Sequence, residues 1–257
     1  MNDLTELLEV AVRAAHVAGR LHLDHKDRAF EVRSKSAPGD LVTEVDSLAE
    51  AAIREVIAGA YPHHAVLGEE GGRSGDAEEE WIVDPLDGTV NYAHGFPVSC
   101  VSIGFQRAGE RLVGAVFDPN RNELFTATRG GGAFLNGRAA RVSGRGALAE
   151  PALLATGFPY NVSEDARNLE LLRRALSRGL PVRRPGAAAL DLCYVACGRL
   201  DGYWEFGLKP WDSAAGSVIV EEAGGRVTDL AGEATPYAEM IVASNGHLHE
   251  ELMNMLR

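Results

Sequence analysis

The sequence predicts an α+β protein. Apolar residues between positions 4 and 21 recur at helical spacing, whereas residues 98–142 form short apolar runs separated by turn residues, as in a hairpin-rich sheet. The last hundred residues alternate between strand-like and helix-like segments. A chain of 257 residues allows one large domain or two small ones at about 150 residues per domain. Since no low-complexity linker interrupts the chain, we predict a single domain over 1–257, with candidate sub-domains at about 1–145 and 146–257.

The first hundred residues are predicted to supply helices and short strands. The expected elements are a helix over 4–21, a helix from the N-cap residue Thr43 to about Val56, strands at 65–67 and 81–83, and an acidic loop over 71–80. We expect Asp84-Pro85 to stop the second strand, because a proline restricts the residue before it and lacks an N–H group. Residues 89–92 are expected to open a short helix.

The later part of the chain is predicted to alternate strand and helix. The expected order after the β-rich segment is a strand at 153–156, a helix over 163–178, an extended segment at 181–184, a helix over 187–197, a strand at 201–206, a helix from Trp211 to Glu222, two short strands and a terminal helix. Pro210 suits the first turn of the helix that follows it, because that turn does not need its missing N–H group.

Composition excludes several classes of protein. Hydrophobic residues make up 46% and charged residues 24%, which is typical of a globular chain. Asp and Glu outnumber Lys and Arg by 37 to 25, so the net charge is −12, and an acidic surface disfavours general nucleic-acid binding. It would also repel an anionic substrate unless cations intervene. No apolar run reaches the roughly 18 residues of a membrane span, and the N-terminus does not resemble a signal peptide. These features predict a cytoplasmic protein without a membrane partner.

The most informative segment is the acidic stretch at 81–92. Pro85 holds Asp84 extended, and Asp87 lies three residues further on, so a rigid turn can direct both carboxylates toward one point. Gly88 has no side chain, and an anion can therefore approach the backbone closely. Taken alone, however, Asp-Pro and Asp-Gly are also ordinary turn dipeptides.

Two further carboxylates extend this pattern. Glu69 follows a predicted strand, although it also fits a solvated acidic loop, and Asp212 lies in the first turn of a predicted helix, where an anion is favourable anyway. Clustered carboxylates repel one another unless protons or cations intervene. Hard oxygen ligands select Mg²⁺, Mn²⁺ or Ca²⁺ over zinc or copper, so the sequence favours a site for such ions.

Together these segments resemble the inositol monophosphatase family of metal-dependent, lithium-sensitive sugar-phosphate phosphatases. The matching stretches are Gly68-Glu69-Glu70, WIVDPLDGTVNYAHGFPVSCVSIGF at 81–105 and LKPWDSAAG at 208–216, with further similarity at 35–46, 130–137 and 183–205. The resemblance implies a layered α-β-α-β-α sandwich, shared with fructose-1,6-bisphosphatase, and a homodimer.

The resemblance also implies two or three Mg²⁺ ions, with Mn²⁺ as a substitute. The implied ligands are Glu69, Asp84 and the backbone carbonyl of Leu86 for the first ion, Asp84, Asp87 and Asp212 for the second, and Glu69 with Asp46, through water, for a weaker third. Lys35 is expected close to this site.

The same resemblance assigns catalytic and substrate-binding roles. Thr89 with Glu69 would orient the attacking water, while Asp84 would bridge the two principal ions. The residues implied in substrate binding are Gly88 and Thr89 through their N–H groups, Asp87 and Asp212 beside the phosphate, Gly186, Ala187, Ala188 and Glu205 at the sugar ring, and Arg183, which the dimer contact would bring near.

The implied reaction is Mg²⁺-dependent hydrolysis of a small sugar phosphate monoester, with myo-inositol monophosphate as the first candidate. Fructose 1,6-bisphosphate, histidinol phosphate and adenosine 3′,5′-bisphosphate remain alternative substrates. A different class of function also remains open, because some bacterial relatives are linked to transcription or ribosome assembly. In that case the partner would be a macromolecule and the protein a regulatory binding protein.

Overall fold

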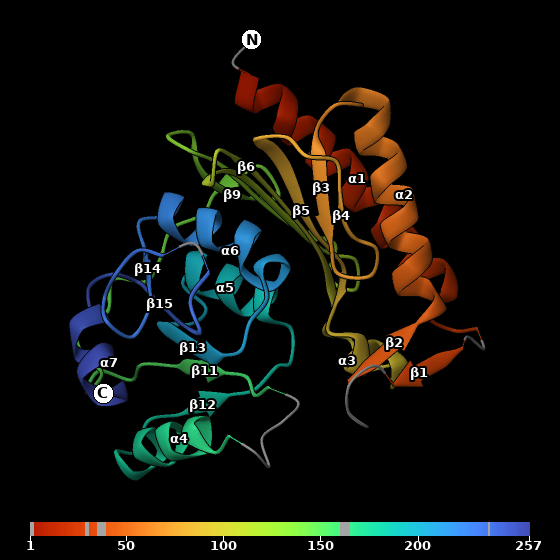
Figure 1. Cartoon of the computed structure of the whole chain (residues 1–257). Coiled ribbons are helices and arrows are strands. Elements are labelled where there is room, and N and C mark those ends of the chain that lie inside the picture. The colour runs from red at the N-terminus through yellow and green to blue at the C-terminus, as the bar shows by residue number, and fades with distance from the viewer. Residues whose placement is uncertain (1–2, 29–30, 35–39, 160–164, 236) are drawn as a thin grey trace.

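The computed structural model describes residues 3–28, 31–34, 40–159, 165–235 and 237–257. Five layers of helices and sheets follow one another, and this confirms the predicted α-β-α-β-α sandwich (Figure 1). From the outside inward and out again, the layers are α1 (Asp3–His25) with α2 (Glu44–Ala60), an eight-stranded sheet, α5 (Ala188–Ala196) with α6 (Pro210–Glu222), a five-stranded sheet, and α4 (Arg167–Ser177) with α7 (His249–Leu256).

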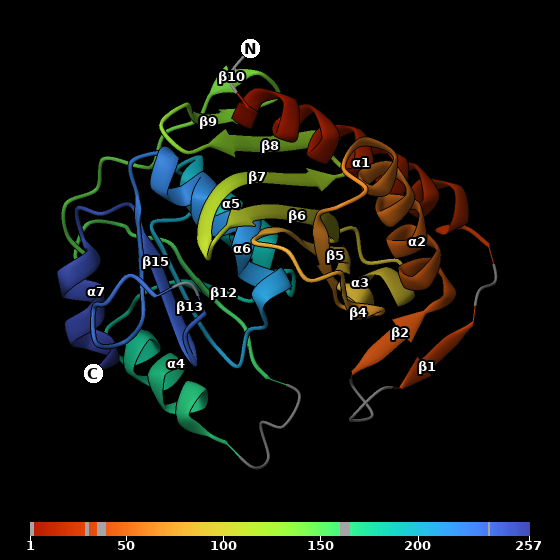
Figure 2. The ribbon, with the colours of Figure 1, turned by 45° about the horizontal axis from the view of Figure 1, so that its top comes forward.

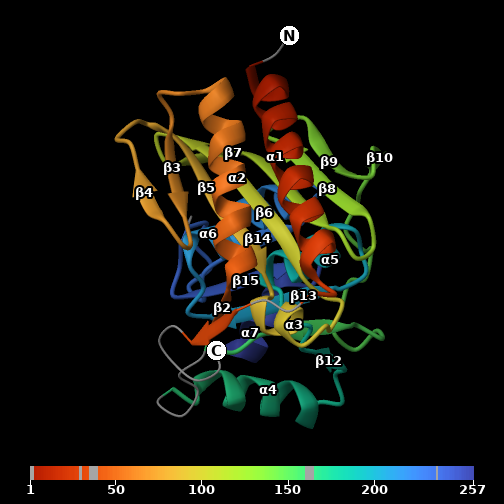
Figure 3. The same ribbon diagram turned by 90° about the vertical axis from the view of Figure 1, so that its right-hand side faces the viewer.

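The strands of the large sheet come from residues 65–139. In spatial order its strands are β10 (Arg138–Ala139), β9 (Gly132–Leu135), β8 (Glu123–Thr128), β7 (Glu110–Asp118), β6 (Cys100–Arg107), β5 (Glu79–Asp87), β3 (Ala65–Gly68) and β4 (Gly72–Ser74). All neighbouring strands are antiparallel except β3 and β5, which are parallel. Figure 3 shows α1 and α2 side by side over the outer face of this sheet. Their apolar residues form a buried cluster with the sheet around Trp81 and Phe105.

The strands of the small sheet come from residues 154–244. Its order is β12 (Val182–Arg183), β11 (Leu154–Thr156), β13 (Gly202–Phe206), β15 (Met240–Ser244) and β14 (Arg226–Thr228). The first three strands are parallel, whereas β15 is antiparallel to both of its neighbours. Helices α4 and α7 cover its outer face through a buried cluster that includes Trp204.

Helix α6 lies between the two sheets, beside α5 (Figure 2). Two glycines of the large sheet allow this close packing. A Cβ atom at Gly104 would lie 2.9 Å from the Cβ of Ala214, and one at Gly114 would overlap the carbonyl oxygen of Ala215. Side chains at these two positions would therefore push the helix away from the sheet.

Some boundaries differ from the prediction. Strand β5 continues through Pro85 to Asp87 rather than stopping at Asp84-Pro85, because a bulge against β6 absorbs the proline. Helix α4 begins at Arg167 rather than at 163, and residues 160–164 lie outside the described residues. The structure adds β4 and an antiparallel pair of strands, β1 (Val32–Ser34) and β2 (Leu41–Thr43), because strands of three residues are too short to show an apolar alternation.

Other predicted features are confirmed. Thr43 caps α2, with a side chain that accepts a hydrogen bond from the Val45 N–H, and a short helix α3 (Thr89–Ala93) follows Gly88. Within the described residues, no helix combines the length and the hydropathy needed to cross a bilayer.

Candidate active site

Strand β5 brings Asp84 and Asp87 onto one face of the large sheet. Side chains three residues apart in a regular strand point to opposite faces. Here Asp84 is opposite Ser102 and Asp87 is opposite Cys100, so an extra residue of β5 is absorbed between them by the bulge. The Ser102 hydroxyl donates a hydrogen bond to the carbonyl oxygen of Trp211 at 3.2 Å, so this face looks toward the start of α6.

Asp84 is buried among other acids. It is 2% exposed, and its Oδ1 accepts a hydrogen bond from the Leu86 N–H at 3.0 Å. Burial raises the pKa of Asp84 well above its usual value, and the negative charges of Glu69, Asp87 and Asp212 raise it further. Acids from the β3–β4 turn, from β5 and from α6 therefore all lie near enough to Asp84 for their charges to raise its pKa.

The Asp87 carboxylate connects the large sheet to α5. Its two oxygens accept hydrogen bonds from the N–H groups of Ala188, at 3.3 Å, and Ala189, at 2.8 Å. The Cys100 thiol lies 3.6 Å from the second oxygen. Burial raises the pKa of Asp87 to about 6, although the hydrogen bonds act in the opposite direction.

Asp212 lies in the first turn of α6, as predicted. It accepts a hydrogen bond from the Lys209 N–H at 2.6 Å and so closes the helix terminus. Removal from water raises the pKa of Asp212 well above its usual value, and the charge of Asp87 adds to the effect. The Asp212 carboxylate therefore stabilises the N-terminus of α6, and its charge also raises the pKa of Asp84.

Glu69 and Asp46 are the other two acids whose charges raise the pKa of Asp84. The Glu69 N–H donates to the carbonyl oxygen of Val83 at 3.2 Å, which places Glu69 beside the strand that ends in Asp84 and Asp87. Asp46 is fully buried on α2, and one of its oxygens lies 3.0 Å from the Thr89 hydroxyl. The same hydroxyl also lies 3.0 Å from the carbonyl oxygen of Leu86.

We define the acidic cluster as Asp46, Glu69, Asp84, Asp87 and Asp212. Its donors are all oxygens, and several pKa values in it are raised by like charge, so a hard divalent cation fits its chemistry. Within the described part of the chain, no group of three or more His, Cys, Asp or Glu side chains is arranged so that it could hold a metal ion. Lys35 lies outside the described residues.

The loop that precedes α5 lies against α3 and Gly88. Gly88 has a φ of 90°, and a Cβ atom there would lie 2.8 Å from the Val98 carbonyl oxygen and 3.3 Å from that of Gly186. The Asn91 side-chain amide donates to the carbonyl oxygens of Val98 and Pro185, each at 2.9 Å. These contacts bring Gly186, and with it the start of α5, next to Gly88.

Glu205 on β13 lies at the edge of the acidic cluster. It accepts a hydrogen bond from the Tyr203 hydroxyl at 2.5 Å, and burial raises its pKa to about 7. The charge of Arg184 counteracts this effect, and the Arg184 guanidinium lies over the Phe158 ring at 5.1 Å. Arg183, the arginine singled out from the sequence, is exposed on β12.

Two residues that the sequence patterns did not indicate, His22 and Tyr92, hold this region together. The buried His22 ring lies 2.9 Å from the carbonyl oxygen of Pro85, and the Tyr92 hydroxyl donates to the His22 carbonyl oxygen at 2.8 Å. Burial lowers the pKa of His22 to about 4, so its ring is neutral and its Nε2–H can donate to Pro85. The predicted helix over 4–21 stopped one residue before His22, and helical spacing gave no sign of its distant partner.

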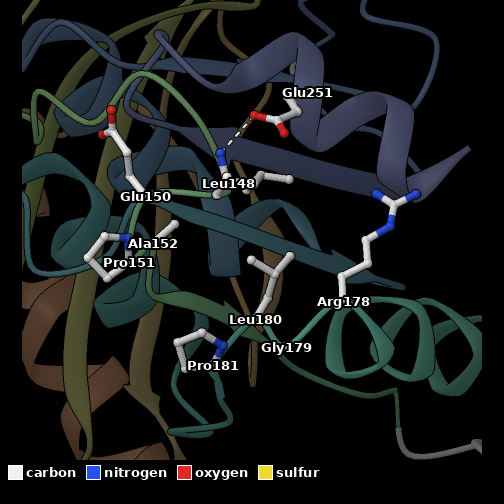
Figure 4. Close-up of a pocket in the computed structure, with 10 residues that line it drawn as sticks. Leu148, Glu150, Pro151, Ala152, Arg178, Gly179, Leu180, Pro181 and Glu251 are labelled. Carbon is white, nitrogen blue, oxygen red and sulfur yellow. Dashed lines mark hydrogen bonds between the residues drawn. The ribbon is translucent and has the colours of Figure 1, made fainter.

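A surface hollow of about 300 Å³ lies elsewhere, beneath α7 and the end of α4 (Figure 4). Leu148, Leu180, Arg178 and Glu251 are among its lining residues, and the Leu148 N–H donates to Glu251 at 2.7 Å. None of its lining residues belongs to the acidic cluster. The convergence of titratable groups therefore identifies the candidate active site better than the presence of a hollow does.

A five-layered α-β-α-β-α sandwich with clustered buried carboxylates defines the class of metal-dependent phosphatases to which we assign the chain. The particular group follows from direct comparison. The profile of the inositol monophosphatase family matches residues 3–257, and the chain belongs to this family.

Named relatives and solved structures agree with this assignment. The chain is 49% identical over 235 residues to the Nus factor SuhB of Pseudomonas aeruginosa, covering 88% of this chain and 86% of the relative. It is 45% identical over 263 residues to the inositol-1-monophosphatase of Synechocystis sp., covering 99% and 90%. The inositol monophosphatase structure from Anabaena superposes with a TM-score of 0.89 at 40% identity, covering 99% and 96%. A structure described as an IMPase/NADP phosphatase complexed with Mg²⁺ and phosphate gives a TM-score of 0.84 at 25% identity, covering 98% and 95%.

Proposed function

We propose that the chain hydrolyses a small sugar phosphate monoester, with myo-inositol monophosphate as the first candidate. The observation that carries this proposal is the acidic cluster, in which carboxylates from α2, β5, α6 and the β3–β4 turn all raise the pKa of the buried Asp84. Family membership and the name of the Synechocystis relative support the same reaction.

Six residues would hold two or three Mg²⁺ ions, or Mn²⁺ in their place. The proposed ligands are Glu69, Asp84 and the Leu86 carbonyl at one ion, Asp84, Asp87 and Asp212 at a second, and Glu69 with Asp46 at a weaker third. When bound, such ions neutralise a phosphate dianion and lower the pKa of water. The all-oxygen donor set supports this choice of metal, as does the neighbour complexed with Mg²⁺ and phosphate.

The residues around the cluster would position the reacting groups. The Thr89 hydroxyl, held between Asp46 and the Leu86 carbonyl, would orient the attacking water together with Glu69. Gly88 has a left-handed conformation, and its own N–H and that of Thr89 would donate hydrogen bonds to a phosphate oxygen.

The sugar ring would bind between the start of α5 and β13. Gly186, whose carbonyl oxygen lies next to Gly88, would line this site with Ala187 and Ala188, and Glu205 would exchange hydrogen bonds with ring hydroxyl groups. A carboxyl group with a pKa of about 7 can donate or accept such bonds near neutral pH. Arg183 and Arg184 would favour a substrate with a second phosphate, so fructose 1,6-bisphosphate, histidinol phosphate and adenosine 3′,5′-bisphosphate belong in the substrate test.

The decisive experiment is a phosphate-release screen over about a dozen sugar and nucleotide phosphates in the presence of Mg²⁺. We expect myo-inositol monophosphate to be hydrolysed, a chelator to stop the reaction, and Mg²⁺ or Mn²⁺ to restore it. Lithium is expected to inhibit. If a folded preparation releases no phosphate from any monoester, the proposed reaction is wrong.

A regulatory role is a second candidate, because the Pseudomonas aeruginosa relative is named a Nus factor. This role predicts a transcription or ribosome-assembly partner that copurifies with the chain. Copurification from a bacterial extract, with the wild type and Asp84→Asn in parallel, separates the two functions. A partner recovered with both proteins would support a role independent of catalysis, whereas recovery of no partner with either protein would count against the regulatory role.

The family resemblance further leads us to propose a homodimer. Size-exclusion chromatography with light scattering should then give twice the chain mass of 27.5 kDa. A mass of one chain at micromolar concentration would contradict the dimer.

A further inference from the structure

Glu50 is a buried acid that belongs to no proposed ligand set. It lies on α2, one helical turn after Asp46, and is 3% exposed. Residues four apart occupy the same face of a helix, so Asp46, Glu50 and Arg54 form a charged stripe along α2 beneath the candidate site. Asp46 contacts Thr89, whereas Glu50 contacts a different part of the site.

The Glu50 carboxylate accepts hydrogen bonds from the turn that carries Glu69. One oxygen accepts from the Glu70 N–H at 2.7 Å, and the other accepts from the Gly71 N–H at 2.8 Å. These are the two residues that follow Glu69 in the tight connection between β3 and β4. Two backbone positions are thus fixed directly after the proposed metal ligand.

Arg54 fixes Glu50 and the far side of the same hairpin. Its Nε donates to Glu50 at 2.8 Å, while its two terminal nitrogens donate to the Ser74 hydroxyl at 2.7 Å and to the Gly72 carbonyl oxygen at 2.6 Å. The planar guanidinium therefore joins the helix to β4, and the carboxylate is held in one orientation.

The glycines in this turn leave room for the Glu50 carboxylate. A Cβ atom at Gly68 would lie 2.5 Å from the Glu50 carboxyl carbon, and one at Gly71 would lie 2.6 Å from its Oε1. The turn thus wraps around this side chain on both sides of Glu69. On the other side, the Glu69 N–H is paired with Val83, next to Asp84.

We propose that Glu50, anchored by Arg54, is a positioning residue that holds the Glu69 carboxylate toward Asp84 and Asp87. This inference rests on the proposed function, because it assigns Glu50 to the support of a metal ligand. Residues that orient a ligand through hydrogen bonds typically change metal affinity by about 10–100-fold when they are replaced.

The test compares Glu50→Gln with Glu55→Gln, the same chemical change at an exposed position of the same helix. Glutamine has one acceptor oxygen, so it cannot accept from both N–H groups and also pair with Arg54. In metal-free Glu50→Gln, amide hydrogen exchange across residues 66–74 should be at least about tenfold faster than in the wild type. Calorimetric titration should show Mn²⁺ binding weakened by about 10–100-fold. Neither value should change in Glu55→Gln.

Arg54→Lys provides a second variant if Glu50→Gln does not fold. Lysine keeps the charge but cannot reach Glu50, Gly72 and Ser74 together, so exchange and Mn²⁺ affinity should change in the same directions by smaller factors. Mn²⁺ affinity within twofold of the wild type in a folded variant would overturn the inference. If the wild type itself bound no Mn²⁺, the proposed function would fail and the role in metal binding with it, whereas faster exchange would still show that Glu50 holds the turn.

Discussion

Asp84 combines burial and like charge in one carboxyl group. It is almost fully enclosed, and the four other acids of the cluster raise its pKa beyond the effect of burial. A charge in such a place destabilises the folded protein unless a proton or a cation neutralises it. The arrangement therefore favours ion binding at the expense of stability in the metal-free protein, as is common where active-site groups are buried.

Asp84→Asn should abolish Mg²⁺-dependent phosphate release while the chain stays folded. Asparagine keeps an oxygen that can accept the Leu86 N–H but removes one buried negative charge. We therefore expect the free energy of unfolding of the metal-free variant, measured by denaturant titration at pH 8, to be no lower than that of the wild type. Near-normal turnover in this variant would rule out the mechanism.

Glu205 predicts how stability depends on pH. The pKa of Glu205 is 4.5 for an ordinary glutamate, as in the unfolded chain, and about 7 in the folded chain, so the folded state binds the proton more tightly. Its contribution to stability is complete below about pH 4.5 and is lost as the pH rises through about 7. Asp87, with a pKa of about 6, acts in the same direction.

The metal-free protein should therefore lose stability between pH 5 and pH 8, and Glu205→Gln should lose less. Because Glu205 is partly exposed, we expect a difference on the order of 1 kcal/mol between the two proteins over this range. Denaturant titrations in a chelating buffer at several pH values measure it. Parallel pH profiles for the wild type and the variant would show that Glu205 does not control the effect.

Among the elements, α6 is packed closely against the large sheet. It is buried between the two sheets, and its first turn carries Asp212. Its approach to the large sheet depends on Gly104 and Gly114, where no side chain separates helix from strand. The position of Asp212, a proposed metal ligand, therefore depends on the packing of the α6 backbone against Gly104 and Gly114.

Gly114→Ala should destabilise the protein by about 1–3 kcal/mol, because the new methyl group would overlap the Ala215 carbonyl. It should also weaken Mn²⁺ binding, since a displaced α6 carries Asp212 with it. Gly59→Ala is the matched control, because that glycine lies in a helix with no atom within 4 Å of the added Cβ. The control should be neutral or slightly stabilising in thermal unfolding; unchanged stability in Gly114→Ala would show that the layers can separate freely.

At the scale of the whole molecule, the middle helices join the two sheets. Buried residues of α5 and α6 form one cluster with strands of both sheets, such as Phe125 on β8 and Tyr203 on β13. The candidate site has the same character, because Asp87 binds backbone groups of α5 and Asn91 binds the loop before it. We therefore propose that 1–145 and 146–257 do not fold independently.

Unfolding should accordingly occur in one cooperative transition. Trp81 lies in the core beneath the large sheet and Trp204 in the core beneath the small one, so each reports on a different half. Both variants also carry Trp211→Phe, so that each keeps one tryptophan. Fluorescence of Trp81→Phe/Trp211→Phe and of Trp204→Phe/Trp211→Phe should each follow the far-UV circular dichroism of the same variant during denaturant titration. Two separated midpoints would indicate independent sub-domains.

Local patterns anticipated most helices and strands because they depend on neighbours in sequence. The helical spacing of residues 4–21, the cap at Thr43 and Pro210 at the start of α6 all act within a few residues, and each is confirmed. The bulge in β5 was not anticipated, because it depends on the register with β6 rather than on Asp84-Pro85 alone. The roles of His22, Asn91 and Glu50 were missed for the same reason, since their partners lie far away in the chain.

The amino-acid sequence by itself determined the kinds of groups available: oxygen-bearing acids in Gly68-Glu69-Glu70, at 84–87 and at Asp212, together with helices and strands of about the right length. Only the tertiary structure decided which of these groups lie together and which support the others. Glu50 and Glu69 are both acids, yet one accepts backbone hydrogen bonds while the other belongs to the acidic cluster. Chemical identity is a property of each residue, whereas proximity depends on strand register and layer packing between segments distant in sequence.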